Sequence, residues 1–298
     1  MKVEIKLQET TFIDLTSDFG FKKLFGEEPN KELLISFLNG VFEGRKQILD
    51  LQYARSESLG DGPDEGGAIF DLVCSGIGGE KFIIEVQRAK QEHFKKRALF
   101  YTSRLISNQA PKGKRAIWGY DITEVYLVAL LDEFTITDTL NDRYLHDVCL
   151  CERTTGKVFY EGLGYLYIEL PKFNKQENEL TNDLDRWLFV LKNMSRLKKI
   201  PVYLRKTIFE KVFDIATYSR LKKEERMAYD VSLKRKWDEY SIKETAFNDG
   251  KKEGVLEGKR EGIQTIAREL LKKGLSIDLI AETTGLSKEE IARLSPDD

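Results

Sequence analysis

Two short apolar runs joined by a glycine-rich turn constrain this chain more than any other feature. The runs are Ala68–Cys74 and Lys81–Gln87, and three glycines lie between them. Apolar runs of this length with glycines between them are typical of a β-hairpin. If the turn is centred on Gly78, the numbers of facing residues add up to 156. The pattern therefore predicts that Asp71 lies opposite Glu85.

The acidic side chains of this hairpin indicate a metal site. Alternation along a strand puts Glu85 and Gln87 on one face and the apolar residues on the other. Facing residues lie about 5 Å apart, so the carboxylates of Asp71 and Glu85 would repel each other without a cation. Oxygen ligands suit Mg²⁺ or Mn²⁺, which one or two carboxylates often hold. The alternative is that both acids pair with Arg or Lys on an ordinary sheet.

The segment after the hairpin is strongly basic. Arg88–Arg115 carries nine basic residues against one acid, a local net charge of +8. Its middle has a helical pattern in which Phe94 and Ala98 face a core and a polar stripe is formed by Arg97, Tyr101, Arg104 and Asn108. Because this helix follows the acidic strand directly, the two predict a shared anionic substrate such as backbone phosphate. The alternative is a solvated helix face.

These residues resemble a known family. The order of acid, hairpin, Glu-x-Gln and basic helix resembles the PD-(D/E)XK nuclease superfamily, and within it the Rpn-type group of bacterial recombination-promoting nucleases and transposases. The supporting stretches are Ser17–Gly26, Leu33–Asn39, Ile84–Gln87, and Arg97–Tyr101 with Gln109. The resemblance covers about residues 10–170, and more weakly the C-terminal region. It implies an α/β fold with a mixed sheet, a restriction-endonuclease-like core and a helical C-terminal extension.

The resemblance also implies catalytic roles. Asp71 and Glu85 would ligate the divalent metal, Mg²⁺ or Mn²⁺, and Gln87 would occupy the place of the superfamily's lysine. A neutral amide can orient the attacking water or offer an oxygen to the metal, but it cannot supply positive charge. Asp18 would have a supporting catalytic role, or would be the N-cap of the following helix.

The basic run and the resemblance together predict contacts with DNA. Lys22 is a candidate phosphate contact or an ordinary exposed lysine, and Tyr101 and Arg97 match family helix residues that orient Gln87 or the phosphate. The full set of predicted DNA contacts is Lys22, Arg88, Lys95, Arg97, Tyr101 and Arg104.

Composition limits the remaining possibilities. The chain has 298 residues, 41% of them hydrophobic, and a net charge of −2, so nucleic-acid binding must be local. Three cysteines are too few for a disulfide framework, which predicts a reducing cytoplasm. No apolar run approaches the ~18–20 residues needed to cross a bilayer, so no membrane association is expected.

The pattern along the chain predicts four regions. They are a nuclease-like domain at 10–175, a helical extension at 176–248, a linker helix with regularly spaced glycines at 249–262, and a helix-turn-helix-like module at 263–298. Within the first region, the expected elements are helices in Phe21–Phe42 and strands at Gln47–Ser56, Glu124–Leu131, Tyr144–Glu152 and Gly164–Leu170.

The C-terminal region leaves two questions open. Glycine recurs every four residues from Gly250 to Gly262, which indicates a semi-flexible linker or close helix packing in a homo-oligomer, and the linker is favoured. In the last helix, two basic residues stand against Glu289 and Glu290, a poor charge balance for DNA. The module is therefore interpreted as either a DNA reader or a protein-contact module.

Three functions remain. The first is a metal-dependent DNA endonuclease, a phosphodiester hydrolase associated with recombination, transposition or defence. The second is an inactive DNA-binding member of the same fold, and the third is an interaction protein. The endonuclease is favoured because Asp71, Glu85 and Gln87 occur together beside a basic helix.

Overall fold

The computed structural model describes residues 11–54, 57–58, 68–69, 71–90, 92–110, 119–136 and 142–294. The chain divides into two compact units, Met1–Leu233 and Lys234–Asp298. Within the described residues, no helix combines the length and apolar character needed to span a membrane.

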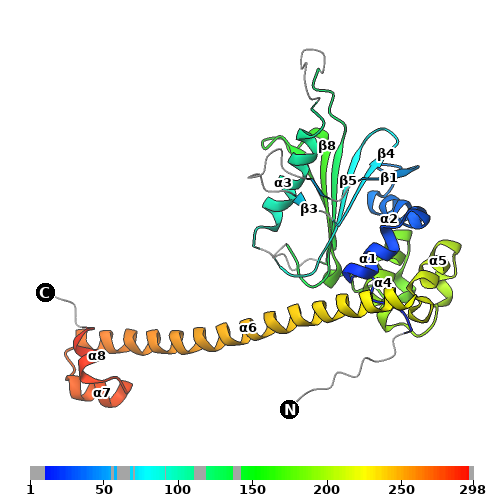
Figure 1. The fold of residues 1–298 in the computed structure, drawn as a ribbon. Coiled ribbons are helices and arrows are strands. Elements are labelled where there is room, and N and C mark those ends of the chain that lie inside the picture. Colours follow the sequence, from blue (N-terminus) through cyan, green and yellow to red (C-terminus); the bar gives the residue numbers. More distant parts are fainter. Residues whose placement is uncertain are drawn as a thin grey trace. The chain divides into compact units, whose positions relative to one another are not determined.

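A mixed sheet forms the centre of the first unit (Figure 1). Its described strands lie in the order β1-β4-β5-β6-β8-β7; β5, β6 and β8 are parallel to one another, and the other neighbours are antiparallel. Their bounds are β1 Leu51–Tyr53, β4 Leu72–Gly76, β5 Lys81–Gln87, β6 Val125–Leu131, β7 Leu145–Cys151 and β8 Val158–Glu169. A separate two-stranded sheet pairs β2, Glu57–Ser58, with β3, Ala68–Ile69.

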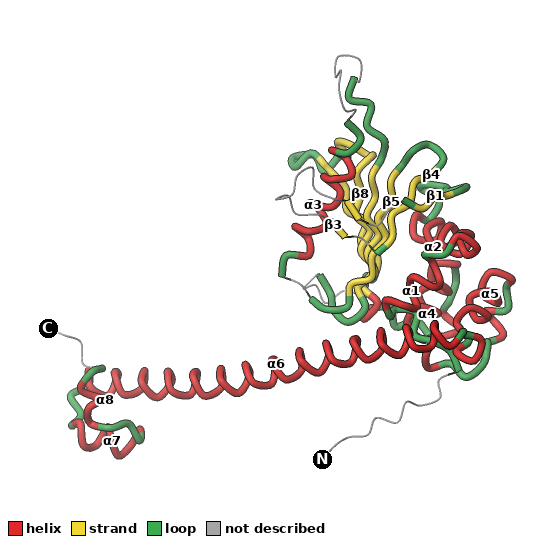
Figure 2. Tube along the Cα trace, in the orientation of Figure 1, coloured by secondary structure: helices red, strands yellow, loops and turns green. Residues whose placement is uncertain are grey.

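Helices cover both faces of the sheet (Figure 2). One face packs against helices whose bounds are α1 Asp18–Phe25, α2 Lys31–Phe42, α4 Asp183–Asn193 and α5 Thr207–Ala216. The other packs against α3, Phe94–Ser107. Every residue of β6 is buried, because this strand is central and covered on both sides. This mixed sheet with helices confirms the predicted α/β fold class.

Side-chain alternation along β5 determines which residues enter which core. Phe82 and Ile84 belong to the larger core, which α1, α2, α4 and α5 complete. Ile83 belongs to the smaller core beneath α3, together with Phe94 and Ala98. Odd-numbered positions of β5 therefore face α3.

The structure corrects one predicted strand. Ala68–Cys74 is not continuous, because β3 pairs with β2 whereas β4 pairs with β1 and β5. A strand that changes partners must turn between the two sheets, and Asp71 lies in a bend immediately before β4. The polar stretch 59–67 and the potential helix breakers Pro111 and Gly113 lie outside the described residues.

Helices that follow the sheet complete its larger core. Trp187 of α4 is fully buried, with its ring centroid 5.6 Å from that of Phe25 and 5.0 Å from that of Phe209. Its indole N–H donates to Ser36 Oγ at 3.1 Å. The predicted helical extension thus packs, as far as Leu233, in the same compact unit as the sheet.

The second unit contains a small three-helix core. The long helix α6, Lys223–Lys272, starts in the first unit and includes all the regularly spaced glycines of the predicted linker helix. It is followed by α7, Ile277–Thr284, and α8, Lys288–Ala292, whose N-caps are Ser276 and Ser287. Their core is formed by Ala267, Ile280 and Ile291.

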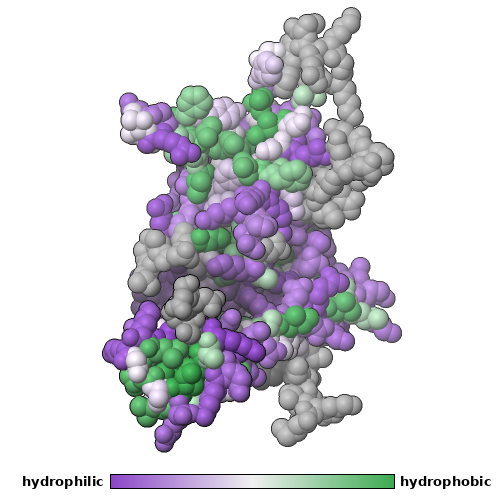
Figure 3. Space-filling view, turned by 90° about the vertical axis from the view of Figure 1, so that its left-hand side faces the viewer, coloured by the Kyte–Doolittle hydropathy of each residue, from purple (hydrophilic) through white to green (hydrophobic). Residues whose placement is uncertain are grey.

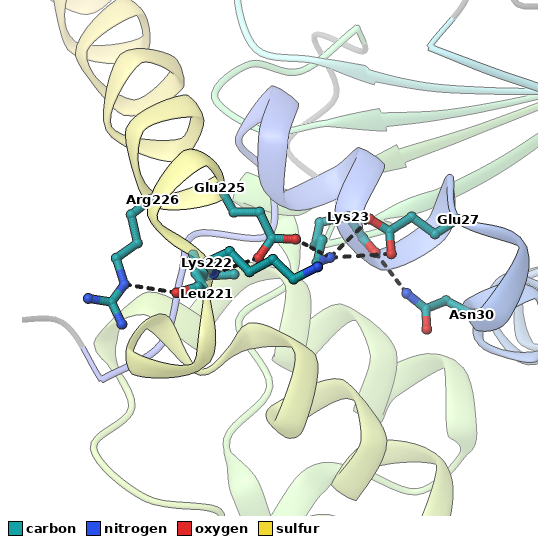
Figure 4. A network of polar contacts seen from close by, with 7 residues as sticks. All are labelled: Lys23, Glu27, Asn30, Leu221, Lys222, Glu225 and Arg226. Carbon is teal, nitrogen blue, oxygen red and sulfur yellow. Dashed lines mark hydrogen bonds and ion pairs between the residues drawn. The ribbon is translucent and has the colours of Figure 1, made fainter.

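The first turn of α6 is tied to α1 by ion pairs (Figure 4). Lys23 Nζ lies 2.7 Å from Glu225 Oε1 and 3.0 Å from Glu27 Oε1. Glu225 also accepts the N–H of Lys222 at 2.8 Å, and Asn30 donates to the carbonyl of Lys23. The exposed part of this network contributes little, but Lys23 is only 20% exposed, so its charge needs these partners.

Two further residues of α6 hold the chain just before and within α1. The Tyr229 hydroxyl accepts the backbone N–H of Asp14 at 3.0 Å, and Ser232 Oγ accepts that of Phe19 at 3.2 Å. Tyr229 and Ser232 are both buried. The start of α6 therefore fixes a segment about 210 residues earlier in the sequence.

Replacing Tyr229 with phenylalanine tests this attachment. Tyr229→Phe removes the acceptor of the Asp14 N–H but keeps the ring, so the free energy of unfolding should fall by about 1 kcal/mol. Urea unfolding followed by fluorescence measures the change. The control is Tyr240→Phe on the same helix, where the tyrosine is 55% exposed. Equal stability of the two variants would contradict the role of the Tyr229 hydroxyl.

Candidate active site

The β4–β5 hairpin has the predicted register. Leu72 pairs with Ile84 and Ser75 with Lys81, so the facing residue numbers add up to 156. Asp71 precedes β4 by one residue, and its Oδ2 accepts the backbone N–H of Val86 at 2.8 Å. This bond holds the Asp71 carboxylate against the end of β5, next to Glu85.

Glu85 and Gln87 share the face of β5 that α3 covers. Their odd positions follow Ile83, whose side chain packs in the core beneath α3. Glu85 is only 6% exposed. The amide nitrogen of Gln87 donates to the carbonyl of Ala89 at 3.0 Å, which fixes the orientation of the amide.

Arg97 of α3 reaches both of these side chains. Its Nη2 lies 3.4 Å from Glu85 Oε2 and donates a short hydrogen bond to Gln87 Oε1. The guanidinium carbon lies 5.3 Å from the ring centroid of Phe94 and 5.6 Å from that of Tyr101. Both distances are in the range of cation–π contacts.

Burial raises the pKa values of both acids. The pKa of Glu85 is raised to about 7, chiefly by burial; the charge of Arg97 opposes the rise, and the neighbouring Asp71 adds to it. Burial likewise raises the pKa of Asp71, against the hydrogen bond from Val86. A cation bound between two such acids would favour their charged forms, so raised pKa values of this kind are typical of a cation site.

The start of α1 adds charges near Asp71. Asp18 raises the pKa of Asp71, whereas Lys22 lowers it, so both lie within electrostatic reach. Asp18 and Lys22 pair with each other at 2.9 Å on an exposed surface. The predicted capping alternative for Asp18 is wrong, because Ser17 is the N-cap and accepts the N–H of Gly20.

The other predicted DNA contacts lie at different distances from the acids. Arg88 lowers the pKa of Asp71 and donates from Nε to the carbonyl of Thr16 at 3.1 Å. Burial raises the pKa of Tyr101, and the negative charges of Glu85 and Asp71 add to the rise. Lys95 is exposed on α3, and Arg104 is half-buried about two turns after Arg97. The side of the first unit where α3 lies carries both hydrophilic and hydrophobic side chains (Figure 3), and the exposed residues of α3 include Leu99 and Phe100.

The donor set fits one hard divalent ion. The carboxylates of Asp71 and Glu85 and the amide oxygen of Gln87 are oxygen donors of the kind that Mg²⁺ and Mn²⁺ prefer. Across the described part of the chain, no three His, Cys, Asp or Glu side chains are grouped to hold a metal. A site with two carboxylates is sufficient for Mg²⁺ when substrate phosphate and water complete the coordination.

Sequence reasoning missed the residues that connect this site to the N-terminal segment. Thr16 Oγ1 lies 2.8 Å from Asp14 Oδ1 and 2.9 Å from Asp132 Oδ2. The N–H of Asp132 donates to the carbonyl of Gln87 at 3.0 Å. The only signal in the sequence was the position of Asp132 directly after an apolar strand.

This fold and its pair of acids define a nuclease-like α/β protein. Residues 15–246 match the family model for the PD-(D/E)XK nuclease family transposase. Residues 260–296 match the model for the C-terminal HTH domain of the Rpn/YhgA-like nuclease family. The chain therefore belongs to the PD-(D/E)XK nuclease family transposases, which confirms the Rpn-type resemblance. No curated protein and no solved structure matched the chain.

The raised pKa of Glu85 makes a prediction about metal-free protein. The pKa of the Glu85 carboxyl is about 7 in the folded protein and about 4.5 in the unfolded chain. Its contribution to the free energy of unfolding therefore decreases as the pH rises through that window. Glu85→Gln should therefore increase the free energy of unfolding in EDTA at pH 8 by on the order of 1–3 kcal/mol. The loss of the ion pair between Arg97 and Glu85 reduces this gain.

Thermal or urea unfolding at pH 5 and pH 8 measures this difference. The gain should shrink at pH 5, where Glu85 is already protonated in the folded state. Glu161→Gln, at an exposed glutamate of β8, is the control and should change little at either pH. A loss of stability at pH 8 in Glu85→Gln would mean that the ion pair with Arg97 outweighs burial.

Proposed function

We propose that the protein is a divalent-metal-dependent DNA endonuclease that hydrolyses phosphodiester bonds and acts in recombination, transposition or defence. The observation that carries this proposal is the pairing of Asp71 with the buried Glu85 beneath a basic helix. Membership of a nuclease and transposase family supports the same reaction class.

Each residue of the site has a distinct role in this proposal. Asp71 and Glu85 would hold the ion, which when bound would neutralise phosphate charge and lower the pKa of the attacking water. Gln87 orients that water, because its amide is fixed between Ala89 and Arg97. Asp18 supports the site electrostatically through Asp71.

Backbone phosphate is the substrate group that the surrounding cations favour. Lys22 and Arg88 act on Asp71 from the side of α1, whereas the remaining predicted contacts come from α3. Cations on two sides of the acid pair would hold a backbone phosphate over the metal. Contacts of this kind position the DNA but do not recognise its base sequence. The proposed DNA-binding residues are Lys22, Arg88, Lys95, Arg97, Tyr101 and Arg104.

For the C-terminal HTH domain, the charges favour a targeting role through protein contacts. Lys288 pairs with Asp278, and Arg260 lies 3.6 Å from Glu290. These basic residues are partly neutralised by neighbouring acids, which weakens their attraction for phosphate. Protein contact by this domain is therefore the second candidate function, beside cleavage by the first unit.

Cleavage assays on plasmid and linear DNA test the proposed reaction. We expect nicking or cutting with Mg²⁺ or Mn²⁺ and none with EDTA. Asp71→Asn and Glu85→Gln should each abolish cleavage while keeping the wild-type circular dichroism spectrum, because neither substitution removes packing atoms.

The same variants separate the alternatives. Glu161→Gln, purified in parallel, controls for a contaminating nuclease and should cleave like wild type. Wild-type protein that binds DNA in every metal without cutting it would instead indicate the inactive DNA-binding member. Equal cleavage by wild type, Asp71→Asn and Glu85→Gln would place the chemistry outside this site.

The salt dependence of DNA binding tests the basic residues of α3. Lys95→Gln combined with Arg104→Gln should flatten the plot of log affinity against log salt by roughly 0.9 for each phosphate that the variant no longer neutralises. Fluorescence anisotropy with duplex DNA in Ca²⁺ measures the slope. Lys198→Gln combined with Lys199→Gln removes the same charge at an exposed site, and its slope should match wild type. Equal slopes in the two double variants would exclude α3 from the DNA interface.

A further inference from the structure

Arg97 differs from the other basic residues of α3 in where its charge lies. Lys95 and Lys96 are exposed, whereas the Arg97 guanidinium contacts Glu85 and Gln87 on the neighbouring sheet. Arg97 therefore belongs to the acid pair as well as to the basic helix.

Two rings hold this guanidinium in place. Phe94 and Tyr101 lie three residues before and four residues after Arg97, so all three share one face of α3. Their ring centroids are 5.3 and 5.6 Å from the guanidinium carbon. A flanked guanidinium loses little further side-chain freedom when it makes a directed contact, which suits it to a fixed site.

The charges of the site indicate what Arg97 contributes. A divalent ion between Asp71 and Glu85 gives no net charge, and Gln87 is neutral. Hydrolysis of a phosphodiester increases the negative charge on the phosphate oxygens in the transition state, so a fixed cation beside them lowers the barrier. Arg97 provides such a cation within contact of Gln87, the residue proposed to orient the attacking water.

We propose that Arg97 is a further catalytic residue of this site, and the inference rests on the proposed function. Its guanidinium is the counter-charge of Glu85 before the ion binds. During the reaction it would donate to the scissile phosphate, because an ion held by Asp71 and Glu85 would balance the charge of Glu85. Its role therefore exceeds the general phosphate attraction of the exposed lysines on the same helix.

Relocating the charge tests this role. Arg97→Met should slow single-turnover cleavage in Mg²⁺ by about a hundredfold, the usual effect of removing one electrostatic donor. DNA affinity in Ca²⁺ should change no more than in Lys95→Met, which removes an exposed charge two residues away. Adding Gln87→Lys to Arg97→Met should recover part of the rate, because Gln87 Oε1 touches the guanidinium in the wild type.

A manganese titration without DNA gives a second readout. Removing a cation beside Glu85 should tighten Mn²⁺ binding of Arg97→Met by roughly three- to tenfold, and Lys95→Met should bind Mn²⁺ like wild type. Arg97→Lys keeps the charge but not the planar donor, so it should bind Mn²⁺ like wild type and cleave more slowly. This variant decides the question if Arg97→Met does not fold.

Distinct results would overturn the inference and the proposed function. Wild-type cleavage by Arg97→Met, or equal losses of rate and DNA affinity, would exclude a catalytic role for Arg97 while leaving the endonuclease in place. Unchanged Mn²⁺ affinity in Arg97→Met would exclude its role as counter-charge. Absence of cleavage by the wild type would refute the proposed function, and the titration would still decide whether Arg97 balances Glu85.

Discussion

Repulsion between two carboxylates at the open end of the β4–β5 hairpin is the constraint on which the candidate site depends. The β4–β5 register brings Asp71 next to Glu85, and the packing of α3 over that face of the sheet buries Glu85. Burial raises the pKa of each acid, and their proximity adds to the pKa of Glu85. The cations around them, Arg97 from α3 and Lys22 from α1, reduce this cost without removing it.

The two sides of the site are held by different means. Arg97 is fixed by contacts within α3 and to β5, so its position follows from the packing of one helix on the sheet. The α1 side depends on α6, because Tyr229 and Ser232 accept backbone N–H groups of the segment that leads to Lys22. A change at the start of α6 would therefore move one side of the site and leave the acid pair in place.

Much of the sheet was predictable because its patterns are local. Period-two alternation assigned Glu85 and Gln87 to one face, and the central glycine of the turn gave the register. The prediction failed where the chain changes partners, at the bend that contains Asp71, since no local pattern reveals which strand is the neighbour. It also offered Asp18 as the cap when the adjacent Ser17 is the residue that accepts the N–H.

By itself, the sequence determined the hairpin, the identity of its acids, the basic helix that follows and the family, because these depend on residue type and short spacing. Only the tertiary structure decided that Arg97 contacts Glu85 and Gln87, that Thr16 joins Asp14 to Asp132, and that Tyr229 holds the N-terminal segment. Apart from the local bond between Thr16 and Asp14, these contacts join residues from about ten to more than two hundred positions apart. They form because burial leaves charges and backbone N–H groups in need of partners, and the packing of helices on the sheet determines which partners are near.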